Sequence, residues 1–191
     1  MKRIMLVVIV VLIAFYFVPV TVTGSVYVVT NGMATVPMPL TKVKVFDADE
    51  FNKALEFKKL DYITNCSQLP SPNEMTQLEL TAIQDGPAAI NQFLEYRKQT
   101  EACSTASFLS SAEYLTPIET VVTDKDGKFE LNVNRFGKVV LVADGKRLVA
   151  SGEETYTWLG RFAPSLASFS AKLDLTNNNE ISSTTIVDIE L

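Results

Sequence analysis

The chain has 191 residues, a net charge of −5 and no histidine. The acidic balance disfavours nucleic acid as a partner, because proteins that bind a phosphate backbone gather Lys and Arg on one face. The lack of histidine excludes Ser-His-Asp and Cys-His catalysis, histidine-ligated zinc or iron, and imidazole as a general base near neutral pH.

The N-terminus carries an apolar segment. Lys2 and Arg3 precede a run of about 17 mostly apolar residues that ends near Val20, which is the pattern of an export signal. Residues 1–23 are predicted either as a cleaved signal peptide or as an uncleaved anchor, and a buried core helix is a third alternative. The basic residues place the rest of the chain on the periplasmic or extracellular side. If the segment is not cleaved, the membrane is one partner.

Two cysteines fit an exported chain. Cys66 and Cys103 are predicted to form a disulfide, because exported proteins commonly pair their thiols. The alternatives are two buried free thiols or, less expected, a two-cysteine metal site. No metal site and no cofactor is predicted.

The first elements after the apolar segment are strands. Val26 and Val28 alternate with Tyr27 and Val29, a Pro-bearing connection covers residues 30–39, and Val43 and Val45 alternate with lysines. This period of two predicts half-buried strands.

The period changes to that of helices between about residues 48 and 116. Asp47 and Glu50 are placed as a capping pair, Ser71 and Pro72 as an N-cap and first helical residue, and Gly86-Pro87 as a break. A shorter helical piece is predicted over residues 106–114. An apolar stripe is expected on each helical piece. The first stripe contains Phe51, Ala54, Leu55 and Tyr62, and the second contains Met75, Leu78, Ala82 and Ile83. The third contains Ile90, Phe93 and Leu94, with the stem of Arg97 at its edge, and the fourth contains Leu109 and Ala112.

Short strands return after residue 116. They are predicted over residues 118–123, 128–133 and 138–143, around Tyr156, Trp158 and Phe162, and over 169–175. Asp144-Gly145 is interpreted as a tight turn after which residues 147–150 pair back. A turn is predicted at residues 177–180. Val187, Ile189 and Leu191 alternate, so the last residues are predicted to join a sheet.

The stretch Val121–Val133 admits either a calcium loop or a hairpin turn. If Gly127 is the sixth position of a calcium loop, Val122 and Val133 occupy the first and twelfth positions, where oxygen ligands are required. Asp stabilises a turn through its own backbone and Gly accepts positive φ, so the turn is the stronger interpretation.

Two blocks of this sequence occur together in one family pattern. The first is Gly24-x-Val26 followed by Val43-x-Val45, and the second is Thr123-Asp124-x-Asp126-Gly127-x-Phe129. A further strand over residues 136–142 stands where the pattern has Tyr-x-Leu. These blocks resemble the carboxypeptidase regulatory-like domain. The resemblance implies a mainly β protein: a transthyretin-like (prealbumin-like) antiparallel β-sandwich over residues 24–191, preceded by one apolar helix and interrupted by a helical insertion over about 48–116.

The resemblance also implies a function class. The family suggests a non-enzymatic module with a structural or protein-binding role, here through the helical insertion, with an envelope or surface protein as the expected partner. The alternative for the insertion is that its helices only cap one open end or face of the sandwich. Enzymes of related fold need histidines that this chain lacks. A hydrolase using Glu153 and Glu154 is disfavoured, because adjacent strand residues point to opposite faces. The alternative is a small-ligand or carbohydrate site centred on Trp158 and Tyr156.

Overall fold

The computed structural model describes residues 18–30, 32–66, 68–70, 72–103, 105–110, 115–149, 152–165, 168–182, 184 and 186–190. The predicted N-terminal apolar helix lies outside these residues. None of the described helices has both the length and the apolar character needed to cross a bilayer. The chain divides into a sandwich unit, residues 1–51 and 115–182, and a helical unit, residues 52–114 and 183–191.

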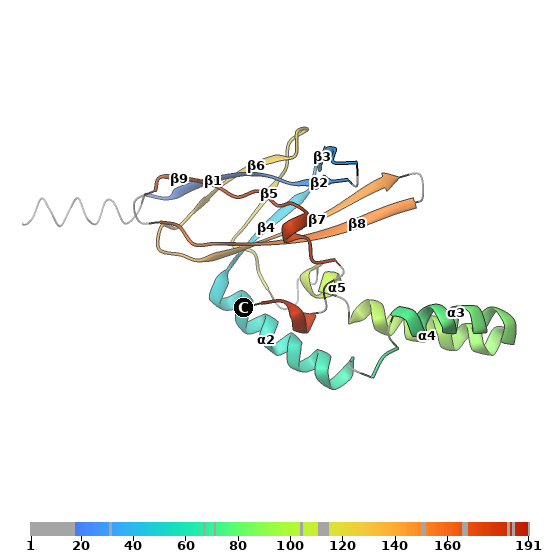
Figure 1. The fold of residues 1–191 in the computed structure, drawn as a ribbon. Coiled ribbons are helices and arrows are strands. Elements are labelled where there is room, and N and C mark those ends of the chain that lie inside the picture. The colour runs from blue at the N-terminus through green and yellow to red at the C-terminus, as the bar shows by residue number, and fades with distance from the viewer. Residues whose placement is uncertain are drawn as a thin grey trace, which may run out of the picture. The chain divides into compact units, whose positions relative to one another are not determined.

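Strands dominate the first unit and helices the second (Figure 1). The strands are β1 Val20–Ser25, β2 Tyr27–Val29, β3 Thr35–Pro37, β4 Lys42–Asp47, β5 Glu119–Val122, β6 Lys128–Val133, β7 Val139–Val149, β8 Gly152–Phe162 and β9 Ser170–Lys172. The helices are α2 Ala48–Asn65, α3 Pro72–Asp85, α4 Pro87–Ala102 and α5 Thr105–Ser110, with 3₁₀ turns η1 Asn177–Asn179 and η2 Ile186–Asp188.

Two sheets share one core, which makes the sandwich. One sheet has the order β6-β1-β9 and the other the order β5-β4-β7-β8, while β2 and β3 form a small hairpin. Alternate residues of both sheets meet in one apolar cluster: β6 contributes Phe129, Leu131 and Val133, and β4 contributes Val43 and Val45. The β-sandwich prediction is therefore confirmed at the level of the fold. The expectation of an antiparallel arrangement holds except at β9, which pairs with β1 in parallel.

Strand β1 begins earlier than the expected domain boundary at residue 24. Val20 and Val22 are fully buried in the core, and β1 pairs with β6 from Val20 onward. The buried guanidinium of Arg135 donates hydrogen bonds to the carbonyl oxygens of Val18 and Ser168, at 3.4 and 2.8 Å. The sandwich unit therefore includes residues that the sequence pattern assigns to the end of the export segment.

The helix boundaries follow the sequence signals. The Oδ1 atom of Asp47 accepts hydrogen bonds from the backbone N–H groups of Asp49 and Glu50, at 2.9 and 3.1 Å, which confirms Asp47 as a cap. Proline stands at the first position of both α3 and α4. Gly86 separates them with a φ of 90°, a conformation that other residues rarely adopt. Ser71 lies outside the described residues.

The Asp124–Gly127 segment is a turn. Asp124 Oδ1 accepts hydrogen bonds from the N–H groups of Asp126 and Lys128, at 2.8 and 2.9 Å. The bond from Lys128 is the main cause that lowers the pKa of the Asp124 carboxyl. Thr123 is buried beside it, where its hydroxyl donates to the carbonyl of Met38 and accepts from the N–H of Thr41. These bonds use the motif for structure, so the hairpin interpretation is confirmed.

The predicted turn at Asp144-Gly145 is wrong. Strand β7 runs through both residues and pairs with β8 along its whole length, from Val139 opposite Phe162 to Val149 opposite Gly152. Gly145 serves packing instead, since a Cβ atom there would lie 3.0 Å from the Trp158 ring and 2.9 Å from Met38. A glycine required by a neighbouring ring has the same sequence signature as a turn glycine.

The predicted C-terminal strand is also wrong. Residues 186–188 form the turn η2, with Ile186 and Ile189 buried and Val187 exposed. Within the helical unit, Lys59 Nζ donates to the carbonyl of Ile189 at 2.7 Å, and Thr105 Oγ1 to that of Thr184 at 2.6 Å. Apolar alternation here reflects packing in the helical unit rather than a sheet. Leu191 lies outside the described residues.

Removal of the start of β1 tests the position of the domain boundary. A chain of residues 18–191 is expected to keep the fold, whereas one of residues 24–191 loses Val20, Val22 and four paired positions of β1, and should lose its cooperative thermal transition. Circular dichroism melting distinguishes them. Equal melting temperatures would contradict this assignment of β1.

Substitution Gly127→Ala tests the turn. Gly127 has a φ of 73°, and a Cβ atom would lie 2.6 Å from the carbonyl oxygen of Val26. Strain of this kind costs about 1–3 kcal/mol, so the free energy of unfolding should fall by at least that amount in urea titrations. Gly32→Ala is the matched control, because its Cβ atom would meet nothing closer than 3.9 Å. The assignment fails if both variants unfold alike.

Candidate functional site

Trp158 lies in the core of the sandwich and not at a surface. Its exposed fraction is 0%, and its ring stacks on Tyr156 with centroids 5.6 Å apart and planes at 17°. Gly145 lies against the same indole. No face of the Trp158 ring is left for a ligand, so this geometry gives no support to the predicted contact there; Tyr156 is half-buried beside it.

The two carboxylates near Tyr156 are engaged with different neighbours. Glu153 pairs with the ammonium of Lys146 at 2.8 Å, and Glu154 accepts a hydrogen bond from the Tyr156 hydroxyl at 2.5 Å. The hydrogen bond to Glu154 is the largest cause that raises the pKa of Tyr156. The carboxylates do not form the facing pair that glycoside hydrolysis uses.

A third carboxyl of the sandwich unit, Asp144, is half-buried between strands. It accepts a hydrogen bond from Thr157 Oγ1 at 3.1 Å and lies 3.9 Å from Lys44 Nζ. Burial raises its pKa, while the Thr157 bond and the Lys44 charge act in the opposite direction. Thr157 and Lys44 lie on the strands that flank Asp144, so this group joins β8, β7 and β4 rather than facing a cavity.

The disulfide Cys66–Cys103 is present in the helical unit, with the two Cα atoms 6.0 Å apart. It joins the residue after α2 to the residue after α4, and so closes the base of the segment that contains α3 and α4. Figure 1 shows these two helices lying alongside each other. The bond holds both ends of this hairpin at one place.

The outer half of the α3–α4 hairpin exposes large aliphatic side chains. Leu80 and Ile83 of α3 are 53% and 71% exposed, and Ile90 and Leu94 of α4 are 40% and 49% exposed. These four residues are called the hairpin patch below. The prediction that Ile83, Ile90 and Leu94 lie on covered apolar stripes is therefore wrong, and no described residue of α4 is fully buried.

The arrangement of the patch follows from helical geometry. The less exposed residues, among them Ala82 on α3 and Phe93 on α4, form the stripes through which two adjacent helices pack. At about 3.6 residues per turn, Ile83, Ile90 and Leu94 fall on one side of the hairpin. Leu80 lies on the outer side of α3.

Charge at the outer end of the hairpin patch has one sign. Between residues 79 and 95 the chain carries Glu79, Asp85 and Glu95 and neither Lys nor Arg. Toward the disulfide, Arg97 follows Leu94 by three residues and so lies on the same face of α4 as Ile90 and Leu94, where it pairs with Glu101 at 3.1 Å. The patch therefore has an acidic border at its outer end and an Arg–Glu ion pair at its other end.

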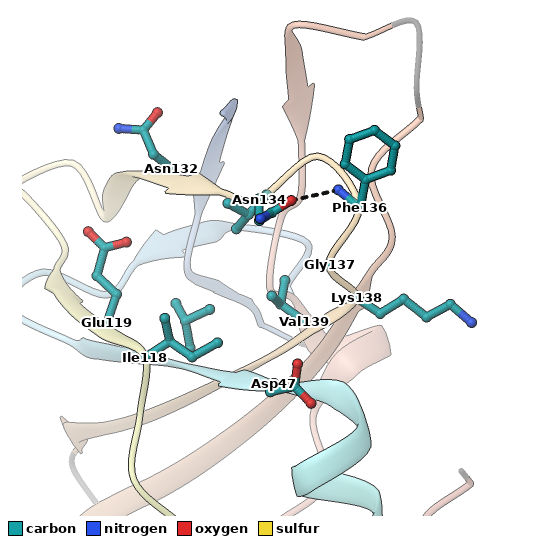
Figure 2. A pocket seen from close by; sticks show the side chains of 11 residues that line it. Asp47, Ile118, Glu119, Asn132, Asn134, Phe136, Gly137, Lys138 and Val139 are labelled. Carbon is teal, nitrogen blue, oxygen red and sulfur yellow. Dashed lines mark hydrogen bonds between the residues drawn. The ribbon is translucent and has the colours of Figure 1, made fainter. Parts of the chain in front are cut away.

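A pocket opens at one end of the sandwich unit, where the chain crosses from β6 to β7 (Figure 2). Its volume is about 310 Å³. The floor consists of core valines, and the rim of polar side chains with Phe136 and Ile118. The lining residues are Val45, Asp47, Ile118, Glu119, Asn132, Val133, Asn134, Phe136, Gly137, Lys138 and Val139. This cavity is called the end pocket below.

One rim residue of the end pocket, Asp47, has a signal in the sequence, and that signal is a helix cap. Phe136 is predicted to belong to a strand, but it is half exposed in the β6–β7 connection, where its N–H donates to Asn134 Oδ1 at 2.9 Å. The polar residues Asn134 and Arg135, directly after β6, are the signal that could have indicated a site. Its meaning depends on β4 and β5, which are distant in sequence.

No protein-family model and no curated protein sequence matches this chain. Solved structures similar to it include a proposed carbohydrate-binding protein of Pseudomonas aeruginosa, with 14% identity and a TM-score of 0.41 over 83% of this chain and 88% of that one. Another is the pilus backbone protein of Streptococcus pneumoniae, with 10% identity and a TM-score of 0.24 over 82% of this chain and 41% of that one. Similarity at these levels carries no argument about function. The carboxypeptidase regulatory-like family stays a prediction.

Replacement of both cysteines by serine tests what the disulfide does. Loss of a cross-link that encloses a loop of this size should destabilise the helical unit by roughly 4 kcal/mol. Limited proteolysis should then cut within α3 and α4 at lower protease concentration than in the wild type. Wild-type protein treated with a reductant should behave as the double variant does. Unchanged proteolysis in both would contradict the role of the bond.

Proposed function

We propose that this chain is a non-enzymatic, exported binding module that holds a protein partner on the hairpin patch. The observation that carries the proposal is the exposure of Leu80, Ile83, Ile90 and Leu94 on two helices with an acidic border. Contiguous exposed aliphatic side chains of this kind mark interaction sites in soluble domains.

The construction of the hairpin supports a docking role over a purely structural one. A helix that serves only to cover a core has its aliphatic residues inside, whereas α4 leaves Ile90 and Leu94 largely exposed. The disulfide limits the freedom of the hairpin before any partner binds, which lowers the entropy lost on binding. A rigid pair of helices presenting aliphatic anchors is a recurrent recognition element.

The acidic border decides which partner is proposed. A protein surface with an apolar groove and Lys or Arg at its edges is complementary to the patch. An anionic lipid surface would be repelled by Glu79, Asp85 and Glu95. A second copy of this chain would bring the same acidic residues toward each other unless the two hairpins were offset.

Export is supported by two independent features of the chain. The sequence begins with a basic pair and an apolar run, and the helical unit contains a disulfide, a bond that persists in oxidising compartments. The module would act on the outer side of the membrane, either anchored by its first residues or released. The complete absence of histidine supports the non-enzymatic part of the proposal.

Charge substitutions within the patch test the proposal. The variant Ile83→Glu/Ile90→Glu should bind its partner at least about tenfold more weakly, because two aliphatic contacts are replaced by carboxylates beside an acidic border. The measurement is quantitative photo-crosslinking in intact cells from a probe at Asn91, which is exposed one turn before Leu94, followed by titration of the captured protein. Binding should also weaken as added salt screens the charges.

The matched control is Thr81→Glu/Gln92→Glu. These exposed positions add the same two charges to the same helices, but on the opposite side of the hairpin from Ile83 and Ile90. Circular dichroism should give equal helix content for both variants. If the two variants capture the partner equally well, the hairpin patch is not its binding site.

A further inference from the structure

The end pocket of the sandwich unit is large enough for one small ligand. Its volume of about 310 Å³ lies at the lower end of the range of ligand sites. The floor contains Val45, Val133 and Val139, which are buried residues of β4, β6 and β7. Because these valines belong to the shared core, the floor is pre-formed and does not depend on a ligand.

One amide group on the rim is held in a fixed orientation. Asn134 Oδ1 accepts a hydrogen bond from the N–H of Phe136 at 2.9 Å, which leaves its Nδ2 group as a donor. Asn132 lies on the outer face of β6, where its Oδ1 accepts from Thr21 Oγ1 at 3.0 Å, so its amide does not face the cavity. Figure 2 shows the bond between Asn134 and Phe136 at the rim.

The acceptors on the rim are carboxylates. Asp47 uses Oδ1 as the cap of α2, which leaves Oδ2, and Glu119 stands at the start of β5. Lys138 extends away from the other rim residues in Figure 2. An anionic ligand is disfavoured by the two carboxylates. A metal ion is disfavoured as well, since no group of three or more metal-binding side chains occurs among the described residues.

Apolar side chains complete the rim. Phe136 is 50% exposed and Ile118 is 64% exposed, on the β6–β7 connection and just before β5. A sugar ring has an apolar C–H face and an edge of hydroxyl groups that both donate and accept. Aromatic and aliphatic surface suits the face, and carboxylates with amide donors suit the edge.

We propose that the end pocket binds a single neutral sugar ring, with Phe136 and Ile118 against its C–H face and Asp47, Glu119 and Asn134 on its hydroxyls. The site is independent of the hairpin patch, because all of its residues belong to the sandwich unit. The affinity of one ring is low, with a dissociation constant of about 1 mM expected from the efficiency of small ligands. A sugar of this size would be one unit of a longer glycan.

Titration of ¹⁵N-labelled protein with glucose, galactose, mannose and glucosamine tests the proposal, with glucuronate and inorganic phosphate as anionic probes. At least one neutral hexose should give saturable shifts in the side-chain amide signals of Asn134 and in the backbone signals of Phe136 and Gly137. Glucuronate and phosphate should not. The proposal is overturned if no neutral hexose shifts these signals, if the shifts map elsewhere, or if only the anionic probes bind.

Single substitutions test whether the rim residues themselves bind the hexose or whether the shifts come from a change elsewhere in the protein. Phe136→Ala and Glu119→Ala change exposed side chains and should each weaken hexose binding about fivefold or more. Phe57→Ala removes another exposed ring, in the helical unit, and should leave binding unchanged. If Phe136→Ala alters the fold, the affinity of the Glu119→Ala variant for the hexose still tests the proposal. If Glu119→Ala binds the hexose as tightly as the wild type does, the rim is not part of the binding site.

Discussion

The fold depends on the burial of one central strand. β1 lies between β6 and β9, and its inward residues Val20 and Val22 are fully enclosed by the opposite sheet. β1 forms backbone hydrogen bonds with β6 on one edge and with β9 on the other, and it packs apolar side chains on one face. Within this sheet, β6 and β9 pair with β1 and not with each other. Arg135 holds the chain where it enters β1 by bonds to Val18 and Ser168. Strand β1 therefore begins within the residues that the sequence pattern assigns to export.

Packing in the core determines which aromatic residues are accessible. Trp158 is enclosed and Tyr156 stacks on it, so the aromatic pair that the sequence suggested for a ligand belongs to the core. A pocket opens at the end of the sandwich unit, where the chain crosses from β6 to β7 and polar side chains surround buried valines. The helical unit has the opposite character, since its hairpin carries aliphatic residues that its own helices do not cover. We propose different partners for these two surfaces, a sugar ring and a protein.

Local signals were reliable where one residue acts on its own backbone. Asp47 caps α2, the prolines start α3 and α4, and Asp124 with Gly127 forms the turn, because each of these effects operates within a few residues. Sequence signals failed where a residue that is distant in the chain determines the local structure. Gly145 was interpreted as a turn residue, although it is required by the Trp158 ring on the neighbouring strand. The C-terminal alternation around Ile189 packs in the helical unit and not in a sheet.

The sequence by itself determined which regions are mainly strands and which are helices, the position of the helical insertion and the pair of cysteines, and its family resemblance suggested the sandwich class. The first three follow from hydrophobic period, turn chemistry and composition, which act locally or need only two residues. Only the tertiary structure decided that Trp158 is core, that Ile83 and Ile90 are surface, and that Asp47, Glu119 and Asn134 surround one cavity. The hydrophobic period of a helix or strand is the same whether or not another element covers its apolar residues, and a pocket is formed by strands that are far apart in the chain. Which residues are buried, and which converge on a pocket, depends on packing and is known only from the tertiary structure.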